Sequence, residues 1–426
     1  MSACGYISQS SSRTRSAPRR SRRKSWTSAM RMPSVAGLDP IGALGYRRAS
    51  GRSAPAAAPS SSVAAMRVAV DARHFGRGRG IARYLEAMLG ELAGRHGEAE
   101  WVAVVSDRGA TDLPDGVTAV ESRGPARLSN ACAALLGRPR LDVIAGGADV
   151  VWIPAPAPVA WSSGVPAVLT VHDISWEERP SDFTPYERAW HAVARPRRLA
   201  ARAARVACVS EATREAILGA GWPVSPGETV VIPEAPTLAP SPATQGSQPP
   251  ESGRYLLFVG ALEPRKGIGT LAAGLAEARL LGLELPLVVV GDGRLRGRLA
   301  PLPGVRLVTG ADDAQLTRLY AGATALIAPS MLEGFGLPPV EAAAFGVPSV
   351  ASDLPPLRES LGQAFLAVPP GDSAALGEAM FAVSTDLALR NRLGEQARER
   401  VGRLSWARSA DRLFSLLLEL GGEPAR

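Results

Sequence analysis

The chain has few cysteines and no long apolar run. Its three cysteines, Cys4, Cys132 and Cys208, stand far apart. They form neither a disulfide framework nor the spacing of a metal site, which is typical of a reducing compartment. A membrane-spanning helix needs about 18 or more consecutive apolar residues, and the sequence contains no such run. We therefore expect a globular protein of the cytoplasm.

Most of the chain also lacks an excess of positive charge. The formal net charge is +8, but residues 1–65 contain 11 Lys and Arg against one acidic residue. The rest of the chain contains 37 basic and 39 acidic residues. Nucleic-acid-binding domains usually carry a basic patch, so we expect no nucleic-acid binding outside residues 1–65.

Residues 1–65 are rich in Ser, Arg, Ala and Pro and have no hydrophobic periodicity, which predicts a disordered basic tail. Three interpretations are open. The tail is an organelle transit peptide, a segment that touches nucleic acid or anionic lipid, or upstream sequence before a start at Met66. We favour the last because the first predicted strand begins directly after Met66.

Beyond the tail, short apolar runs alternate with helical patterns in two blocks. A Pro-, Ser-, Thr- and Gln-rich stretch separates the blocks. This alternation predicts an α/β protein with two doubly wound parallel-sheet domains that face each other across a cleft. We place these domains at 66–235 and 254–404, with a linker at 236–253.

A glycine-rich turn follows the first strand of the first block, at residues 74–84. A turn between strand and helix commonly faces phosphate, although a surface loop with arginines is the simpler alternative. The glycines at 76, 78 and 80 do not form a dinucleotide fingerprint, and no convincing acidic residue ends the next strand. The turn therefore indicates phosphate contact without indicating NAD.

His172 and Asp173 directly follow another predicted strand of the first block, residues 167–171. Open α/β sheets bind their ligands at the carboxyl ends of strands. A lone histidine is more often structural, but this position favours a functional one. Further on, residues 184–207 have a helical pattern that Pro196 should break or kink. Its arginines are either a solvated face or a membrane-binding face, and they are Arg195, Arg197, Arg198, Arg202 and Arg205.

The stretch from Ala325 to Glu341 is the most informative of the chain. A predicted strand, residues 325–328, leads into a turn with Gly334 and Gly336, and then a helix opens with Glu341 in its first turn. Free N–H groups at a helix start favour an anion, and carboxylates accept hydrogen bonds from sugar hydroxyls. Glu333 and Glu341 around such a turn suit a ligand with both phosphate and sugar. The alternative is that Glu341 only complements the helix dipole and Glu333 is a solvated charge.

Arg265 and Lys266 follow the first strand of the second block, residues 255–259. Both cations bind phosphate oxygens. This strand and the one before Glu333 should end at the same rim of one sheet, which places the basic pair near that glutamate. Neutralising a diphosphate there would help to break a sugar–phosphate bond. The sequence shows no cluster of metal ligands, so we expect the basic pair to replace a divalent cation.

Taken together, the motifs resemble the retaining glycosyltransferases of family 4, which have the GT-B fold. The resemblance covers about residues 66–415. Its motifs begin at Asp71, Gly80, Thr170, Val209, Val259 and Glu333. The last is the family's pattern of two glutamates with seven residues between them. Mannosyl- and rhamnosyltransferases of bacterial cell-surface polysaccharide synthesis look most similar.

The resemblance implies roles for particular residues. Glu333 would touch the donor sugar, Glu341 the ribose hydroxyls, and Arg265 with Lys266 the diphosphate. His172 would lie against the sugar, and Gly80 would lie in a loop that faces the phosphates. Backbone N–H groups for sugar and phosphate would come from Phe335, Gly336 and Leu337. The fold also implies that the C-terminal helix, within 405–426, crosses back to the first domain.

Three positions depart from the family's usual pattern. Ala261, Ala82 and Glu234 stand where many relatives have Arg, Gly and Asn. These departures leave the donor open among GDP-, UDP- and dTDP-sugars.

The resemblance implies an enzyme that is metal-independent and needs no cofactor. It would move a hexose, mannose-like, to a hydroxyl of a glycan or lipid-linked acceptor with retention. Such an enzyme works in the cytoplasm, with peripheral contact to the inner face of the plasma membrane as an option.

Two rival functions are a sugar-nucleotide epimerase or reductase and an inactive nucleotide-sugar-binding protein. The first would need a catalytic Tyr with a Lys four residues on, which Tyr84, Tyr186 and Tyr320 lack. The intact glutamates and basic pair argue against the second.

Overall fold

The computed structural model describes residues 65–76, 80–106, 112–122, 126–240 and 254–422. The predicted disordered tail, except for its last residue, and most of the predicted linker lie outside the described residues. The described residues belong to one compact unit. Among the described residues, no helix combines the length and the apolar character needed to cross a bilayer.

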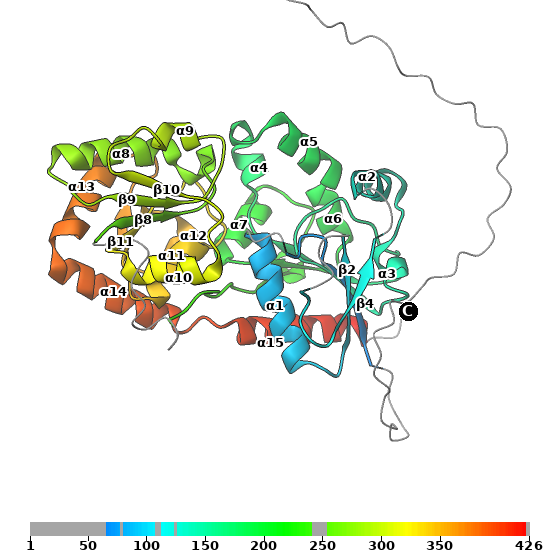
Figure 1. The fold of residues 1–426 in the computed structure, drawn as a ribbon. Helices are drawn as coiled ribbons and strands as arrows, with labels where there is room; N and C mark the ends of the chain where they lie inside the picture. The colour runs from blue at the N-terminus through cyan, green and yellow to red at the C-terminus, as the bar shows by residue number, and fades with distance from the viewer. Residues whose placement is uncertain (1–64, 77–79, 107–111, 123–125, 241–253, 423–426) are drawn as a thin grey trace, which may run out of the picture. The chain divides into compact units, whose positions relative to one another are not determined.

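The first half is a sheet of seven parallel strands in the order β3-β2-β1-β4-β5-β6-β7 (Figure 1). The strands are β1 (Arg67–Asp71), β2 (Glu100–Val105), β3 (Val117–Glu121), β4 (Val150–Ile153), β5 (Ala167–Val171), β6 (Arg205–Cys208) and β7 (Thr229–Val231). The helices are α1 (Ile81–Arg95), α2 (Ala126–Leu136), α3 (Leu141–Ile144), α4 (Ser175–Glu178), α5 (Pro185–Ala194), α6 (Pro196–Arg202) and α7 (Glu211–Gly219), with 3-10 turns η1 (Pro180–Asp182) and η2 (Pro226–Glu228). Strands β4 and β5 are buried at every position, because helices cover both faces of such a sheet.

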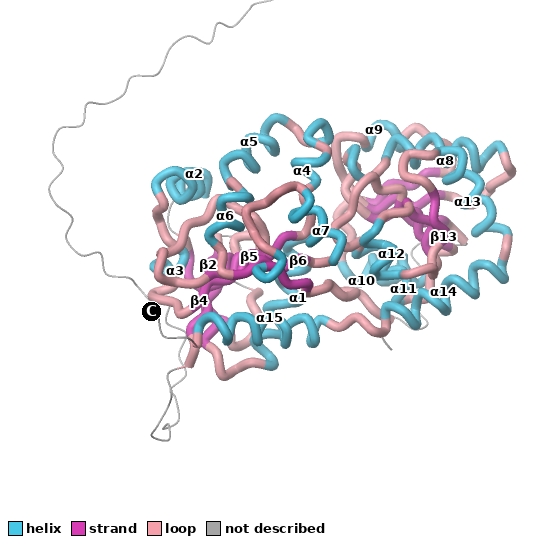
Figure 2. Tube along the Cα trace, turned by 180° about the vertical axis from the view of Figure 1, so that it is seen from behind, coloured by secondary structure: helices cyan, strands magenta, loops and turns pink. Residues whose placement is uncertain are grey.

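The second half repeats this plan with six parallel strands in the order β10-β9-β8-β11-β12-β13. The strands are β8 (Leu256–Val259), β9 (Leu287–Val290), β10 (Val305–Val308), β11 (Ala325–Ala328), β12 (Ser349–Ser352) and β13 (Leu366–Val368). The helices are α8 (Ile268–Leu280), α9 (Arg296–Leu299), α10 (Asp313–Gly322), α11 (Leu337–Ala344), α12 (Pro355–Leu361), α13 (Ser373–Thr385) and α14 (Leu387–Val401), with η3 (Pro264–Lys266) before α8. Figure 2 shows the strands of both sheets enclosed by helices. The predicted pair of doubly wound sheets is confirmed.

The order of the strands decides where each sheet binds a ligand. In both sheets the order in which strands are added reverses beside the first strand, between β1 and β4 and between β8 and β11. In open α/β sheets the loops that leave the two central strands diverge at this point, and ligands bind at the carboxyl ends of these strands. In the second sheet these loops carry Lys266 and Glu333.

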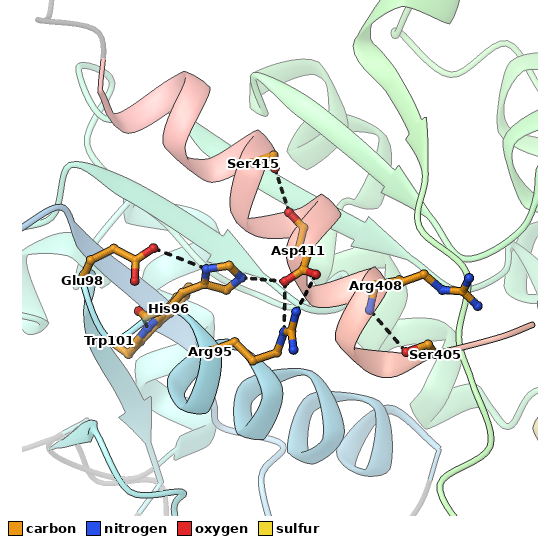
Figure 3. A network of polar contacts seen from close by, with 8 residues as sticks. All are labelled: Arg95, His96, Glu98, Trp101, Ser405, Arg408, Asp411 and Ser415. Atoms are coloured by element: carbon orange, nitrogen blue, oxygen red, sulfur yellow. Dashed lines mark hydrogen bonds and ion pairs between the residues drawn. The ribbon is translucent and has the colours of Figure 1, made fainter.

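The last helix, α15 (Trp406–Gly421), packs against α1 and β4 of the first half. Figure 3 shows the polar side of this contact, where Asp411 accepts hydrogen bonds from Nε and Nη2 of Arg95 at 3.0 and 2.8 Å. His96 approaches the same carboxylate at 3.0 Å and stacks on Phe414. The end of the chain is therefore anchored on the first half, although α14 before it packs against α11 of the second.

The helical pattern at 184–207 forms two helices, and the prediction was too long. Arg195 takes a left-handed backbone with φ 51°, between α5 and α6. Pro196 explains the break because it disfavours the α conformation in the residue before it. The second helix ends at Arg202 and strand β6 begins at Arg205. The five arginines consequently do not share one helix face.

Candidate active site

The site begins with the two loops at the switch point of the second sheet. Nζ of Lys266 lies 2.5 Å from Oε1 of Glu333, and Ser330 donates to the same oxygen at 2.7 Å. The loops are also joined by the backbone, because the N–H of Met331 donates to the carbonyl of Arg265 at 2.8 Å. The structure thus brings the predicted cation and the predicted sugar-binding carboxylate together.

Both partners of this pair keep free binding capacity. An ammonium has three donors and a carboxylate about four acceptor positions. Among the hydrogen bonds of the described residues, Lys266 uses one donor and Oε2 of Glu333 accepts none. The pair can therefore present a positive and a negative group to one ligand. Lys266 is also the single lysine after residue 24 of the sequence, where the other cations are arginines, a pattern that the sequence analysis overlooked.

The turn after Glu333 is shaped by two glycines. Gly336 has φ 91° and caps the start of α11, where a side chain would also overlap Leu357. A Cβ on Gly334 would overlap the carbonyl oxygen of His172 in the first half. Among the described residues, no hydrogen bond uses the N–H of Gly334, Phe335 or Gly336. These donors remain available to a ligand, as does the first helical position, Leu337.

Arg265 lies on the same loop as Lys266 but does not join the pair with Glu333. Its charge acts on Glu187 of the first half. Burial raises the pKa of Glu187, but hydrogen bonds from Thr184 and the charges of Arg294 and Arg265 outweigh it and lower the pKa. Arg265 therefore lies close enough to the first half for its charge to act on Glu187.

Glu341 is the second glutamate of the pattern, and it lies one residue further into the helix than predicted. Helix α11 begins at Leu337, because the preceding Gly336 has a left-handed backbone that does not belong to the helix. Glu341 is then its fifth residue, in the second turn. This position removes it from the helix start and directs it into the protein, where it is 3% exposed.

Three side chains surround the Glu341 carboxylate. Arg83 from α1 approaches Oε1 at 3.2 Å, Thr237 donates to the same oxygen, and Tyr320 donates to Oε2 at 2.9 Å. Burial raises the pKa of Glu341, while Thr237, Arg83 and Tyr320 oppose the shift. Burial and the nearby carboxylate also raise the pKa of Tyr320, which stays a neutral donor. The described contacts give Glu333 and Glu341 no shared partner.

His172 follows β5 of the first half and meets the Gly334 turn through its backbone. Its carbonyl oxygen accepts a hydrogen bond from Thr213 at 2.9 Å, and Ser210 donates to the carbonyl of Gly334 at 2.6 Å. Its ring lies edge-on to Tyr84, with 4.6 Å between ring centroids. Gly80, with φ 36°, caps α1 one turn before Tyr84, and its described contacts do not reach the Glu333 turn.

Several residues of the site were not predicted from the sequence. Arg83 and Tyr84 belong to a motif that was noticed but received no role, and Glu234 was noted only as a departure. Thr237, Tyr320 and Ser330 are common polar residues without a distinctive spacing. Within the described residues, no three His, Cys, Asp or Glu side chains gather as a metal site would require, and metal independence stays a prediction.

Comparisons with known proteins agree with this architecture. Residues 78–235 match the model of the Glycosyltransferase Family 4 domain. Residues 243–400 match that of the Glycosyl transferases group 1 domain. The two matches fall on the two halves of the fold.

Two curated relatives and one solved structure illustrate the similarity. A phosphatidyl-myo-inositol mannosyltransferase of Mycobacterium leprae is 35% identical over 41% of this chain and 49% of its own length. A glycogen synthase of Mycobacterium tuberculosis is 34% identical over 34% of this chain and 37% of its own length. The chain therefore spans half or less of these relatives. Sucrose-phosphate synthase of Thermosynechococcus elongatus has a TM-score of 0.65 at 20% identity, covering 84% of this chain and 99% of that one.

The similarity to sucrose-phosphate synthase concerns the fold alone. The two family models show that the sequences of both halves are also similar to those of glycosyltransferases. The chain belongs to the glycosyltransferases of the GT-B fold, with a family 4 domain followed by a group 1 domain.

Proposed function

We propose that the chain transfers a hexose from a nucleoside-diphosphate sugar to a hydroxyl of a glycan or lipid-linked acceptor, with retention of configuration. The Lys266–Glu333 pair at the switch point of the second sheet carries this proposal. It offers a cation for the diphosphate and a carboxylate oxygen for a sugar hydroxyl within one small region. A mannose-like sugar is favoured by the similarity to the mannosyltransferase.

In the proposed reaction, the bond between the sugar C1 and the phosphate oxygen breaks. The acceptor oxygen bonds to C1 on the same face, and its proton passes to the leaving diphosphate. Lys266 and Arg265 stabilise the negative charge on that diphosphate, together with the N–H groups of the Gly334 turn. Glu333 positions the sugar through its unpaired oxygen.

In this proposal Glu341 binds the ribose of the nucleotide. Its Oε1 is shared by Arg83 and Thr237, so a ribose hydroxyl that binds to this oxygen replaces one of them. The hydrogen bond from Tyr320 to Oε2 keeps the carboxylate oriented during this exchange. Nucleotide binding and the contact between the two halves are then coupled.

A thermal-shift panel tests the proposal. Wild type and Glu341→Gln are heated with GDP-mannose, UDP-glucose, UDP-N-acetylglucosamine, dTDP-rhamnose, GDP, UDP and NAD. A ligand at 100 times its Kd stabilises the folded state by about 2.7 kcal/mol. We expect stabilisation by one family of nucleotides, and a smaller effect in the variant. Stabilisation by NAD alone would favour the epimerase or reductase, and no stabilisation would contradict the proposal.

The inactive binding protein is the second alternative, and the same panel does not separate it from an enzyme. Release of nucleoside diphosphate from the stabilising donor does. We expect slow release by water even without an acceptor, and an enzyme that has lost activity would release none.

Peripheral membrane contact is part of the proposal for the acceptor side. Large apolar side chains are exposed on α2, at Leu128, Leu135 and Leu136, and α2 contacts α5. Arg195 and Arg198 are exposed nearby in sequence, whereas Arg197 and Arg205 form ion pairs with Glu177 and Glu419. We expect sedimentation with anionic vesicles that Leu135→Glu reduces. Equal sedimentation of both proteins would remove α2 from the proposal.

A further inference from the structure

The ring of His172 is fixed at both nitrogens by acceptors. Nδ1 lies 2.9 Å from Oε1 of Glu234, and Nε2 lies 3.0 Å from the carbonyl oxygen of Pro154. A carbonyl oxygen only accepts, and an ionised carboxylate only accepts. A neutral imidazole has one N–H, whereas the imidazolium has two. The geometry therefore matches the protonated ring.

The three partners follow the carboxyl ends of three strands of the first sheet, in which β4 and β5 are neighbours and β7 lies beyond β6. Pro154 follows β4, His172 follows β5, and Glu234 comes three residues after β7. Glu234 is 4% exposed. A buried carboxylate without a partner is costly, and the described hydrogen bonds of Glu234 are limited to the one with His172. Each charge of the pair therefore stabilises the other.

The other groups around the ring do not favour the neutral form. Asp173 adds a second negative charge beside His172. Tyr84 presents its ring edge-on and stays neutral, because burial raises its pKa. Burial alone would lower the pKa of His172, but the hydrogen bond and charge of Glu234 and the Pro154 carbonyl outweigh it and raise the pKa. Across the contact between the halves, Glu333 is already paired with Lys266.

His172 is also one of the residues of the first half that the Gly334 turn touches, together with Ser210. No side chain fits between its carbonyl oxygen and Gly334. A shift of the His172 backbone would therefore be transmitted to the turn beside Glu333.

We propose that Glu234 is a positioning residue that keeps His172 as an imidazolium, fixed at both ring nitrogens beside the Gly334 turn. The effect of this imidazolium on sugar transfer rests on the function proposed above. The protonation state of the His172 ring does not depend on that function. The imidazolium brings a positive charge that cannot rotate away from the site.

Nuclear magnetic resonance of the full chain labelled with 15N-histidine tests this state. The sequence has four histidines, and the signals that disappear in His172→Gln are those of the His172 ring. In wild type we expect both ring nitrogens of His172 to be protonated at pH 7 and to titrate above the usual pKa of about 6.5. A ring with one unprotonated nitrogen at pH 7, or titration at or below the usual value, would overturn the proposal.

Variants of Glu234 identify the cause. Glu234→Gln keeps the shape and removes the charge, so His172 should titrate at lower pH than in wild type. Glu234→Asp keeps the charge and should restore part of the shift. His74, His96 and His191 serve as internal controls and should titrate unchanged. An unchanged His172 in a folded Glu234→Gln would contradict the role of Glu234.

The wild-type measurement decides the proposal even where a variant fails to fold. It is also independent of the transferase proposal. Absence of nucleotide binding with a protonated His172 would remove the proposed function and leave the ion pair. A neutral His172 in a protein that binds nucleotide sugars would do the reverse.

Discussion

Nη1 of Arg83 lies 3.2 Å from Oε1 of Glu341, and this ion pair joins α1 of the first half to α11 of the second. The side chain of Arg83 is 17% exposed and that of Glu341 4%. Arg83 also contacts Asp313 at the start of α10. The carboxylate that we assign to the ribose is thus neutralised by an arginine of the other half of the protein.

The first prediction concerns the strength of this pair. Arg83→Met leaves a buried carboxylate without its cation, and we expect a loss of about 3 kcal/mol in the free energy of unfolding. The double variant with Glu341→Gln should recover part of it, as a double-mutant cycle in urea would show. Arg95→Met is the matched control because its ion pair with Asp411 is exposed, and it should cost much less. An equal loss of unfolding free energy in Arg83→Met and Arg95→Met would contradict a special role for Arg83.

The second prediction concerns the contact between Gly334 and His172. Gly334→Ala places a methyl group against the His172 carbonyl oxygen, which pushes the turn away from the first half. We expect nucleotide binding to persist while sugar transfer falls at least about 100-fold, because a displacement of about 1 Å is enough for such a loss. Gly269→Ala in α8 is the control, since its Cβ meets no atom within 4 Å. Full transfer activity in Gly334→Ala would show that this contact is not needed.

The third prediction uses the raised pKa of His172. The folded state retains a proton on His172 that the unfolded chain loses near pH 6.5. Stability from the pair is therefore complete below that pH and is lost as the pH rises through the folded value, with a slope of at most about 1.4 kcal/mol per pH unit. Burial lowers the pKa of His191. The contribution of His191 to the pH dependence of stability therefore falls below pH 6.5, outside the range in which His172 loses its proton. Urea unfolding from pH 6 to 9 should show a fall that is absent in Glu234→Gln. Parallel profiles for the two proteins would refute the linkage.

The fourth prediction uses the scarcity of lysine. Pyridoxal phosphate forms an imine with accessible lysines, and borohydride fixes the product. Lys266 should be modified, and a bound nucleotide sugar should protect it, whereas a nucleoside without phosphates should not. Peptide mass spectrometry measures both lysines of the chain, with Lys24 as the unprotected control. Equal modification of Lys266 with and without the nucleotide sugar would place the diphosphate elsewhere.

The sequence was sufficient for the parts of the site that depend on one sheet. Strand periodicity located β11 at Ala325–Ala328, and the rule that parallel strands end at a common rim placed Lys266 near Glu333. It was insufficient for pairs that join the two halves. Arg83 with Glu341 and Ser210 with Gly334 are separated by 258 and 124 residues. No local pattern encodes such contacts.

Backbone details near glycine and proline were the other source of error. The sequence placed Glu341 in the first turn of its helix because the prolines at 338 and 339 suggested the start. The helix starts at Leu337 instead, directly after the left-handed Gly336, so Glu341 is its fifth residue. The pair of Glu234 with His172 could be suspected only from the departure at Glu234, since a buried acid needs a partner.

The most direct test of the central claim is the fate of the donor sugar. The nucleotide sugar that stabilises the protein is incubated with wild type, Lys266→Met and Glu333→Gln, and proton nuclear magnetic resonance follows the sugar. We predict release of nucleoside diphosphate by wild type, with the first product in the anomeric configuration of the donor, and a loss of at least about 100-fold in both variants. Equal release by all three proteins, or a first product with inverted configuration, would contradict a retaining transferase that acts through the Lys266–Glu333 pair.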